Sequence, residues 1–288
     1  MGIPRLGIET SRIPHSDRHG LLWLSRGELF VSSGTLRFVT AGCEGLDPGT
    51  YDIPYQNVSM ILLGPGTSIT HDVFRLTASH GTALIAVGED GVRMYSAQPL
   101  GPDWSALARR QTNLWADGTS RIFIARAMYA KRMGEIFPNL ELSVLRGMEG
   151  ARAREMYFLM AHKFGISWKG RNYDRKNPEG TDIPNQALNH AATVAYAASS
   201  IAVAATRTIP QLGFIHEDSG QSFILDIADI FRDTFTLPVA FGASKQFFRE
   251  QGVSIERHVR KHAGVTLRRQ GIISKMIDMI KDLLEEGV

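Results

Sequence analysis

The spacing of apolar positions along the chain changes near Trp104. Before that point the apolar stretches are short and are separated by Gly and Pro, as at Gly64–Gly66. Thr35–Thr40 alternates between apolar and polar residues, whereas Val58–Leu63 and Ala83–Val87 are almost continuous apolar runs. These patterns predict β-strands, and the continuous runs are typical of strands that are buried on both faces.

Two further features belong to the same region. Leu21–Leu24 and Glu28–Val31 flank Ser25–Gly27, and this arrangement predicts a β-hairpin. Thr70–His80 is compatible with a short helix that begins at Thr70 or His71. This part of the chain therefore predicts a small β-domain.

After Trp104 the apolar residues recur at helical spacing. Arg121–Phe137 predicts one helix, and Leu140–Phe164 predicts another that ends at Gly165. Asn185–Thr206 is apolar nearly all round, which predicts a central, buried helix. The second part of the chain is therefore expected to be helical.

The predicted fold class is α+β, with a small N-terminal β-domain at residues 1–102 and a larger all-α domain at residues 103–288. A chain of 288 residues with 43% hydrophobic content can bury a core in each. No apolar run approaches the roughly 20 residues of a membrane span. The N-terminus lacks a signal-peptide pattern, and the single Cys43 has no disulfide partner within the chain. We therefore expect a cytoplasmic protein without a membrane partner.

Charge is distributed unevenly along the chain, although the formal net charge is only +3. Residues 1–101 contain seven Arg, no Lys and nine acidic residues. Lys245–Lys275 contains eight Lys and Arg residues, with only Glu250 and Glu256 to oppose them. Such a segment suits the phosphate backbone of nucleic acids, and it is equally compatible with a solvated helix face.

The candidate chemistry centres on two carboxylates within the apolar run Phe223–Phe231. A charge in such a run is costly unless it is paired or bound to a metal. If Ser222–Arg232 is helical, Asp226 and Asp229 lie on one face of the helix. With His216, ten residues before Asp226, they form a set of donors that suits a hard metal ion.

Simpler explanations exist for each of these residues taken alone. His216 is compatible with a hydrogen-bonded buried histidine, and either Asp226 or Asp229 with a helix cap or a salt bridge to Arg232. No phosphate-binding loop, dinucleotide fingerprint or cysteine cluster competes with the acidic motif.

A second acidic element surrounds Glu149. This residue stands at helical spacing from Arg146 and Arg152, which by itself indicates an ion network on a helix surface. The neighbouring Gly147 and Gly150 also allow a backbone or a ligand to approach closely.

Several segments together resemble the CRISPR-associated integrase family Cas1, subtype I-E. The resemblance extends over roughly residues 13–287, in order and at compatible spacing. In the second half of the chain it rests on Arg146–Arg154, Trp168–Asp174, Asn185–Leu188, Gly213–His216 and Ser222–Asp229. In the first half it rests on Gly64–Thr67 and Val87–Tyr95.

This resemblance implies a β-domain that builds a homodimer and a helical catalytic domain with a divalent metal. It assigns the metal ligands to Glu149, His216 and Asp229, and it makes Asp226 a supporting acid that orients His216 or a metal-bound water. Mg²⁺ and Mn²⁺ are the expected ions, and one imidazole among carboxylates favours Mn²⁺ modestly.

The resemblance also implies a reaction and its partners. Two homodimers bridge a dimer of the small protein Cas2, and the complex inserts short protospacer duplexes into the leader-repeat region of the CRISPR array. A DNA 3′-hydroxyl attacks a phosphodiester, so the protein places the reacting groups and neutralises charge without supplying a nucleophile. The expected role is spacer acquisition in antiviral defence.

Basic and aromatic residues are the candidates for contact with double-stranded DNA. The basic candidates are Arg75, Arg93, Arg146, Arg152, Arg232, Lys245, Arg249, Arg257 and Arg260. Trp168 and Tyr173 are candidates for stacking on a base, with packing inside the protein as the alternative.

The sequence departs from the family pattern in several places. Ser68 stands where related chains often carry Arg, and Arg26 stands where relatives can offer a Tyr to the DNA end. The turn Glu217–Ser219 replaces a less acidic turn that contains Lys. Because the chain ends at Val288 without a Pro-rich tail, motif selection by such a tail is not expected.

Two other functions remain open on the sequence. One is a general metal-dependent nuclease on branched or single-stranded DNA, which would use the same site without partner or array. The other is a non-catalytic DNA-binding scaffold, in which Glu149, His216 and Asp229 are structural.

Overall fold

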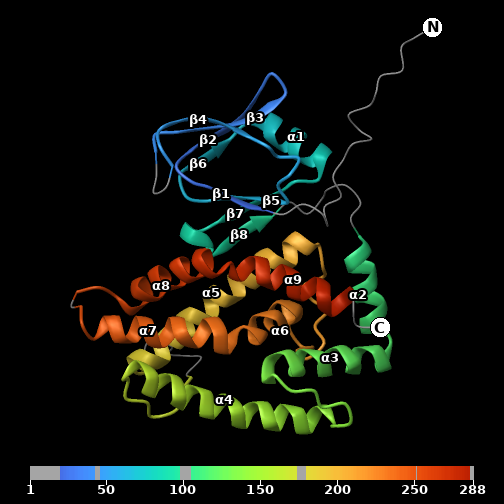
Figure 1. Cartoon of the computed structure of the whole chain (residues 1–288), viewed down its shortest axis with the longest axis vertical. Coiled ribbons are helices and arrows are strands. Elements are labelled where there is room, and N and C mark those ends of the chain that lie inside the picture. The colour runs from blue at the N-terminus through green and yellow to red at the C-terminus, as the bar shows by residue number, and fades with distance from the viewer. Residues whose placement is uncertain (1–19, 43–45, 98–104, 174–179, 251, 286–288) are drawn as a thin grey trace. The chain divides into compact units, whose positions relative to one another are not determined.

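The structure is a computed structural model, and it describes residues 20–42, 46–97, 105–173, 180–250 and 252–285. The chain divides into two compact units. One consists of Met1–Glu89 and Met94–Trp104, and the other of Asp90–Arg93 and Ser105–Val288. The first contains the β-strands and the second the long helices, which confirms the predicted fold class (Figure 1). The predicted boundary between residues 102 and 103 and the single Cys43 lie outside the described residues.

The first sheet of the β unit is mostly parallel. Its strand order is β1 (Leu21–Leu24), β5 (Met60–Leu63), β7 (Ala83–Val87) and β8 (Met94–Ala97), and only β8 runs antiparallel to its neighbour. Parallel strands are usually covered on both faces, which explains why β5 and β7 are continuous apolar runs.

The second sheet has the order β4 (Gly49–Ile53), β3 (Thr35–Thr40), β2 (Gly27–Ser32) and β6 (Thr67–Ile69). Strands β2 and β3 form a hairpin whose last pair is Ser32 and Thr35. Its two turn residues, Ser33 and Gly34, both have positive φ, at 51° and 77°. This is the turn geometry that matches the twist of paired strands.

The predicted hairpin between Leu21–Leu24 and Glu28–Val31 is wrong. Strand β1 pairs with β5, whereas β2 pairs with β3 and β6 in the other sheet. The connection contains Arg26 in the left-handed region, at φ 57°. The chain passes from one sheet to the other at this connection. There the N–H groups of Arg26 and Gly27 donate to the carbonyls of Pro65 and Gly66.

The two sheets share one core with helix α1 (His71–His80), which confirms the short helix expected after Thr70. Helix α1 is followed by Gly81, whose φ of 74° is the left-handed conformation common after helices. The buried residues of this core are Leu24, Leu29, Leu36, Phe38, Ile53, Ile61, Val73 and Leu84.

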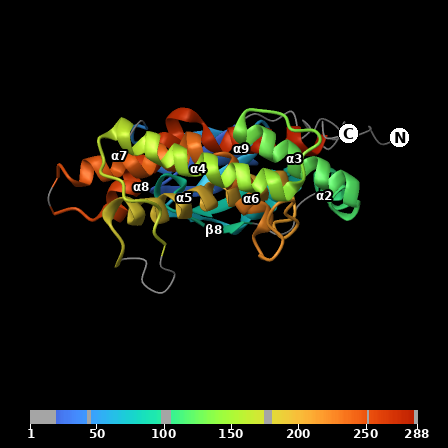
Figure 2. The ribbon, with the colours of Figure 1, turned by 90° about the horizontal axis from the view of Figure 1, so that it is seen from below.

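Eight α-helices are described in the second unit. They are α2 (Ala106–Ala116), α3 (Gly118–Met133), α4 (Leu142–Phe164), α5 (Ile183–Thr206), α6 (Ser222–Ile230), α7 (Leu237–Phe247), α8 (Ile255–Gln270) and α9 (Ile272–Glu285). Helix α5 packs against α6, α7, α8 and α9, whereas α4 lies along the outer side of the unit (Figure 2). None of the described helices is long and apolar enough to cross a membrane.

The central helix α5 confirms the prediction of a buried helix at Asn185–Thr206. Asp182 caps its N-terminus by accepting a hydrogen bond from the Asn185 N–H at 3.0 Å, and Pro184 occupies its first turn. Both features are favourable at helix starts. Alanines along α5 are buried, so neighbouring helices can approach it closely.

Helix α3 differs from the predicted Arg121–Phe137 at both ends. It begins at Gly118, where Asp117 caps the helix by accepting from the Ser120 N–H at 2.7 Å. It stops at Met133, because Gly134 adopts a left-handed φ of 76°. Helix α4, by contrast, ends at the predicted Gly165.

Candidate active site

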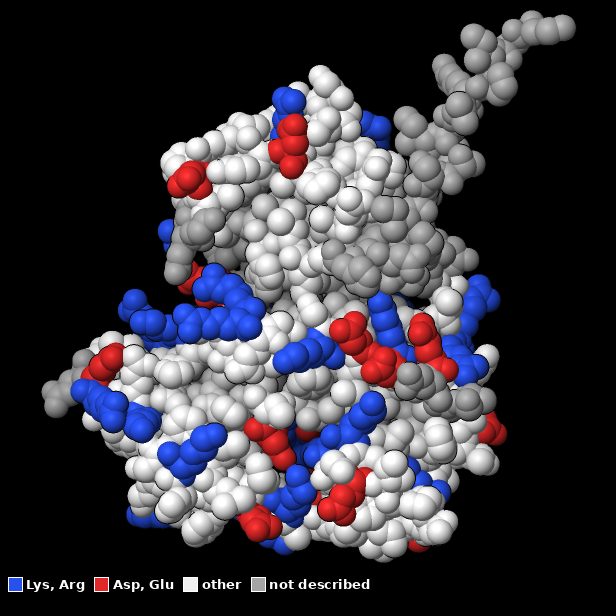
Figure 3. All heavy atoms as spheres, viewed as in Figure 1, with Lys and Arg blue, Asp and Glu red and all other residues white. Residues whose placement is uncertain are grey.

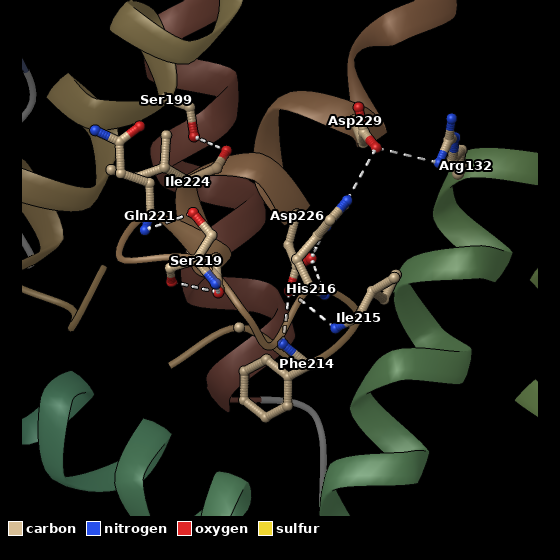
Figure 4. A network of polar contacts seen from close by, with 12 residues as sticks. Arg132, Ser199, Phe214, Ile215, His216, Ser219, Gln221, Ile224, Asp226 and Asp229 are labelled. Atoms are coloured by element: carbon tan, nitrogen blue, oxygen red, sulfur yellow. Dashed lines mark hydrogen bonds and ion pairs between the residues drawn. The ribbon is translucent and has the colours of Figure 1, made fainter. Parts of the chain in front are cut away.

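A buried carboxylate, Asp226 on α6, organises the loop that precedes this helix (Figure 4). Only 1% of Asp226 is exposed. Its carboxylate accepts hydrogen bonds from the N–H groups of Phe214 at 2.6 Å, Ile215 at 3.1 Å and His216 at 3.0 Å. These donors compensate the carboxylate for the loss of water.

The same carboxylate orients the imidazole of His216. Nδ1 of His216 lies 2.7 Å from Oδ1 of Asp226, and Nε2 lies 3.9 Å from Oδ2 of Asp229. The hydrogen bond to Asp226 raises the pKa of His216, burial opposes the rise, and the negative charges of both carboxylates add to it. Because Nδ1 is engaged by Asp226, Nε2 is the ring nitrogen that remains free to bind a ligand.

Helix α2 holds the loop in place from the other side. The indole N–H of Trp115 donates to the carbonyl of Gly213 at 2.9 Å. The fully buried side chain of Gln111 accepts from the N–H of Ile209 at 2.7 Å. A Cβ atom on Gly213 would lie 2.4 Å from the carbonyl oxygen of His216. The tight turn before the histidine therefore requires glycine.

Glu149 and Asp229 are brought together by two arginines. Nη2 of Arg132 lies 2.5 Å from Oε1 of Glu149, and Nη1 of Arg132 lies 3.6 Å from Oδ2 of Asp229. Nη1 of Arg232 lies 3.5 Å from Oε1 of Glu149, and its Nη2 forms a close ion pair with Oδ1 of Asp229. The four charged side chains, from α3, α4 and the α6 region, form one compact network.

Helix α6 places both aspartates toward His216, as expected for residues three apart on one face. The predicted helix Ser222–Arg232 is nevertheless interrupted. Regular α-helix ends at Ile230, and Arg232–Thr236 forms a wide π-helical turn before α7. Such turns are frequent at functional sites, and this one begins at the arginine that contacts the acidic pair.

Glu149 belongs to a mostly buried ion network and not to a network on the surface of its own helix. Its ion partners come from other elements of the fold, and among the described residues it forms no ion pair with Arg146 or Arg152. A Cβ atom on Gly147 or Gly150 would meet nothing within 4 Å. Both glycines therefore have open space where a side chain would stand.

Two further residues near the site, Arg132 and Tyr196, belong to none of the sequence motifs. Arg132 follows Lys131 in the last turn of α3, where basic residues are common because they complement the helix dipole. Burial raises the pKa of Tyr196, and the charge of Asp229 raises it further. Burial lowers the pKa of Arg232, but the neighbouring negative charges, Asp229 foremost, outweigh burial and leave that pKa raised.

The donor atoms around Arg132 suit a divalent cation chemically. They are two carboxylates and one imidazole nitrogen, with Asp226 behind the imidazole. Among the described residues no three His, Cys, Asp or Glu side chains are close enough to share one ion. Arg132 and Arg232 supply the positive charge between the acids, so a cation held by Glu149, His216 and Asp229 would replace charge that these arginines now provide.

The basic DNA-binding candidates occupy several places. Arg232 belongs to the acidic site, and Arg75 pairs with Asp72 on α1 of the β unit at 3.0 Å. Arg93 pairs with Glu256 at 2.9 Å. Lys245 is half-buried. The remaining candidates are exposed, namely Arg146, Arg152, Arg249, Arg257 and Arg260. Basic side chains gather over α8 on the face drawn in Figure 3.

The two aromatic candidates have different surroundings. Trp168 stacks on Tyr157 with ring centroids 5.5 Å apart and meets the edge of Phe241 at 5.5 Å. Tyr173 is exposed, and the guanidinium of Arg171 lies 5.4 Å from its ring centroid. Trp168 therefore packs within the protein, whereas the ring of Tyr173 is accessible.

A buried asparagine fixes the loop that carries Tyr173. Oδ1 of Asn185, a residue with no exposed surface, accepts from Nη1 of Arg171 at 3.0 Å and from the Asn172 N–H at 2.9 Å. Its Nδ2 donates to the carbonyl of Gly170 at 3.1 Å and to Asp182 at 2.8 Å. We name this arrangement the Asn185 clamp, since the bonds to Gly170, Arg171 and Asn172 join the loop to the start of α5.

Comparisons with known proteins agree on one family. The model of the family described as CRISPR associated protein Cas1 matches residues 131–271. The chain is 36% identical over 277 residues to the CRISPR-associated endonuclease Cas1 of Geobacter sulfurreducens, with 96% of this chain and 87% of that protein covered. It is 34% identical over 276 residues to the CRISPR-associated endonuclease Cas1 of Escherichia coli K12, with 96% and 88% covered. The crystal structure of a TtCas1–DNA complex is similar at a TM-score of 0.83 and 30% identity, with 93% of this chain and 97% of that chain covered.

Proposed function

The chain belongs to the Cas1 family of CRISPR-associated endonucleases, and we propose that it is the metal-dependent DNA integrase of CRISPR adaptation in a subtype I-E system. The substrate would be a short protospacer duplex, which is inserted into the leader-repeat region of the CRISPR array. The observation that supports the proposal is one charged network, in which Arg132 contacts both Glu149 and Asp229, and Nε2 of His216 faces Asp229.

The reaction that this site would support is a transesterification. The 3′-oxygen of the incoming strand forms a bond to phosphorus, and the bond from phosphorus to the target strand's 3′-oxygen breaks. The attacking hydroxyl loses a proton and the leaving oxygen gains one. One phosphodiester replaces another, so no covalent intermediate with the protein and no external energy source is needed.

The roles of the side chains follow from their contacts. Glu149, His216 and Asp229 would hold Mg²⁺ or Mn²⁺, which stabilises negative charge on phosphate oxygens when it is bound. Asp226 keeps the His216 ring turned so that Nε2 faces Asp229. Arg232 neutralises the acidic pair, and its guanidinium is a group that would also suit a phosphate.

DNA is proposed as a partner from one relative and from the charge pattern, and the homodimer and Cas2 are proposed from the family resemblance. The related TtCas1 was crystallised in complex with DNA, and a basic surface over α8 suits a DNA backbone here. A homodimer and a bridging Cas2 dimer complete the proposed assembly.

A general nuclease is the second candidate function, because the relatives carry the name endonuclease. It would use the same acidic site with water in place of the DNA hydroxyl. The two functions differ in product, since the nuclease releases ends whereas the integrase joins them.

The test is strand transfer by the protein mixed with Cas2, a labelled duplex with free 3′-hydroxyls and a supercoiled plasmid carrying leader and repeats. We expect joined product at the leader-repeat border with Mn²⁺ or Mg²⁺ and none with chelator. Asp229→Ala should lower the rate by about a hundredfold or more, as expected when a metal ligand is lost. Asp218→Ala is the matched control, because this exposed acid lies in the turn next to His216.

The outcomes separate the candidate functions. Cleavage without joining would favour the nuclease, and DNA binding without either would leave the non-catalytic scaffold. Full integration activity in a folded Glu149→Ala or His216→Ala variant would overturn the metal-dependent mechanism.

A further inference from the structure

We propose that Arg132 is the resident counterion of the acidic site and competes with divalent cations for Glu149 and Asp229. The inference rests on the proposed function, because it concerns the same site. It assigns a role to a residue of α3 that lies outside the acidic motifs.

Arg132 contacts one oxygen on each of two acids. Its two terminal nitrogens reach Oε1 of Glu149 at 2.5 Å and Oδ2 of Asp229 at 3.6 Å. The same Oδ2 is the oxygen that faces Nε2 of His216 at 3.9 Å. The guanidinium therefore contacts an oxygen on each of the two carboxylate ligands proposed for the metal. Figure 4 shows Asp229 between Arg132 and the third proposed ligand, His216.

Burial explains why these contacts are needed. The Arg132 side chain is only 10% exposed, and those of Glu149 and Asp229 are 16% and 17% exposed. A guanidinium this deep is costly unless it is paired with acids, and two neighbouring carboxylates repel each other unless a cation stands between them. Without metal, Arg132 satisfies both requirements and links α3 to α4 and α6.

Arg232 touches the same two acids, but it is placed differently. It is three residues from Asp229 in sequence and pairs mainly with the other oxygen, Oδ1. It can therefore keep this pair while Oδ2 changes partner. Arg132 holds Oδ2 itself, so a cation that binds Oδ2 must displace or repel the guanidinium.

Competition at shared oxygens has a thermodynamic consequence. The contacts that Arg132 makes stabilise the metal-free protein, and the same contacts must be given up when a cation binds. Removal of Arg132 should weaken the metal-free fold and strengthen cation binding.

The test is direct Mn²⁺ binding by the full-length protein, without DNA or Cas2, followed through the electron paramagnetic resonance signal of free Mn²⁺. Arg132→Gln should bind Mn²⁺ at least about tenfold more tightly than the wild type, because one unit charge a few ångströms away is removed. Arg132→Lys keeps the charge but has no fork to bridge both acids, so it should fold and give an intermediate affinity. Lys131→Gln, the loss of an exposed charge one residue away, should leave the affinity unchanged.

A second measurement follows thermal unfolding in chelator. Arg132→Gln should unfold several degrees below the wild type, and saturating Mn²⁺ should narrow that difference. Lys131→Gln should unfold at the same temperature as the wild type, both in chelator and in saturating Mn²⁺.

The results distinguish this inference from the proposed function. If Mn²⁺ binding in the wild type is lost with Asp229→Ala but is equal or weaker in Arg132→Gln and Arg132→Lys, Arg132 does not compete and only this inference fails. If no variant binds Mn²⁺, or if binding ignores both Glu149→Ala and Asp229→Ala, the metal site and the inference fail together.

Discussion

At the scale of single residues, the site depends on the carboxylate of Asp226, which is buried away from solvent. Asp226 accepts from three consecutive backbone N–H groups and from the His216 ring, and it is 1% exposed. Its geometry is that of a positioning residue. It sets the loop and the ring, while the carboxylates of Asp229 and Glu149 contact Arg132 and Arg232.

The substitution Asp226→Asn tests this role. An amide keeps one acceptor but adds two donors that face existing N–H groups, so the loop and ring should lose their fixed arrangement. The hydrogen bond to Asp226 is the main cause of the raised His216 pKa, so this pKa should fall in the variant. An NMR titration of the metal-free protein measures it. The change Asp218→Asn should leave it in place, and an unchanged value in Asp226→Asn would show that the ring is held by other contacts.

The surroundings of His262 determine how it contributes to the pH dependence of stability. Burial lowers the pKa of His262, and the charges of His258 and Lys261 lower it further. Below about pH 6.5 the unfolded chain therefore binds a proton that the folded state resists. Stability should be greatest above that pH and should decrease as the pH falls through the window below it.

Urea unfolding at pH 7.5 and pH 5.5 checks this sign. His262→Gln should reduce the difference between the two pH values, by less than about 1 kcal/mol because the residue is only half-buried. If His262→Gln loses as much stability between pH 7.5 and pH 5.5 as the wild type does, other groups cause the pH dependence.

At the scale of elements, helices hold the functional loops through buried amides. Gln111 on α2 bonds the segment before Gly213, and Asn185 on α5 bonds the loop that carries Tyr173. Both amide side chains are fully buried and have hydrogen bonds on both ends. These hydrogen bonds fix the loops relative to the helices, because a shift of either loop would leave a buried polar group without a partner.

Removal of the Asn185 clamp should be costly. Asn185→Ala leaves the Gly170 carbonyl, the Asn172 N–H and part of Arg171 without their partners, so we expect a loss of roughly 2–4 kcal/mol in the free energy of unfolding. Chemical denaturation measures the loss. The control is Thr193→Ala, whose exposed hydroxyl bonds only the helix backbone and should cost less than about 0.5 kcal/mol. Equal stability of the two variants would contradict the clamp.

At the scale of the whole molecule, charge separates into a neutralised site and a basic surface. In the site, acids and arginines balance one another, whereas exposed cations such as Arg257 and Arg260 lie on α8. Arg260 has only a long 3.9 Å contact with Glu256. The surface of α8 therefore has positive charge available for phosphate.

The double substitution Arg257→Gln and Arg260→Gln tests this surface. DNA affinity should fall, and the slope of log affinity against log salt should decrease by about one for each phosphate that the variant no longer binds. Titration of a fluorescent duplex at several salt concentrations measures both. Arg109→Gln, an exposed arginine on α2, should change neither. If the slope of log affinity against log salt is unchanged in the double variant, DNA does not bind at this surface of α8.

The sequence by itself determined the two-part fold, the helix ends at Gly165 and Thr206, and the choice of His216, Asp226 and Asp229 as candidates, whereas the family resemblance added Glu149 as a metal ligand. These features are local, since apolar periodicity, glycine conformation and short motifs need only near neighbours in the chain. In the tertiary structure His216 contacts Asp226 and faces Asp229, and Arg132 and Arg232 link Glu149 to Asp229.

Only the tertiary structure decided which distant segments are partners. It paired β1 with β5 instead of β2, ended the regular helix at Ile230, and inserted Arg132 between the acids of the site. An arginine at the end of an amphipathic helix looks the same in sequence whether it faces water or an acid. Its role depends on packing between segments far apart in the chain, where pairing compensates the cost of burial.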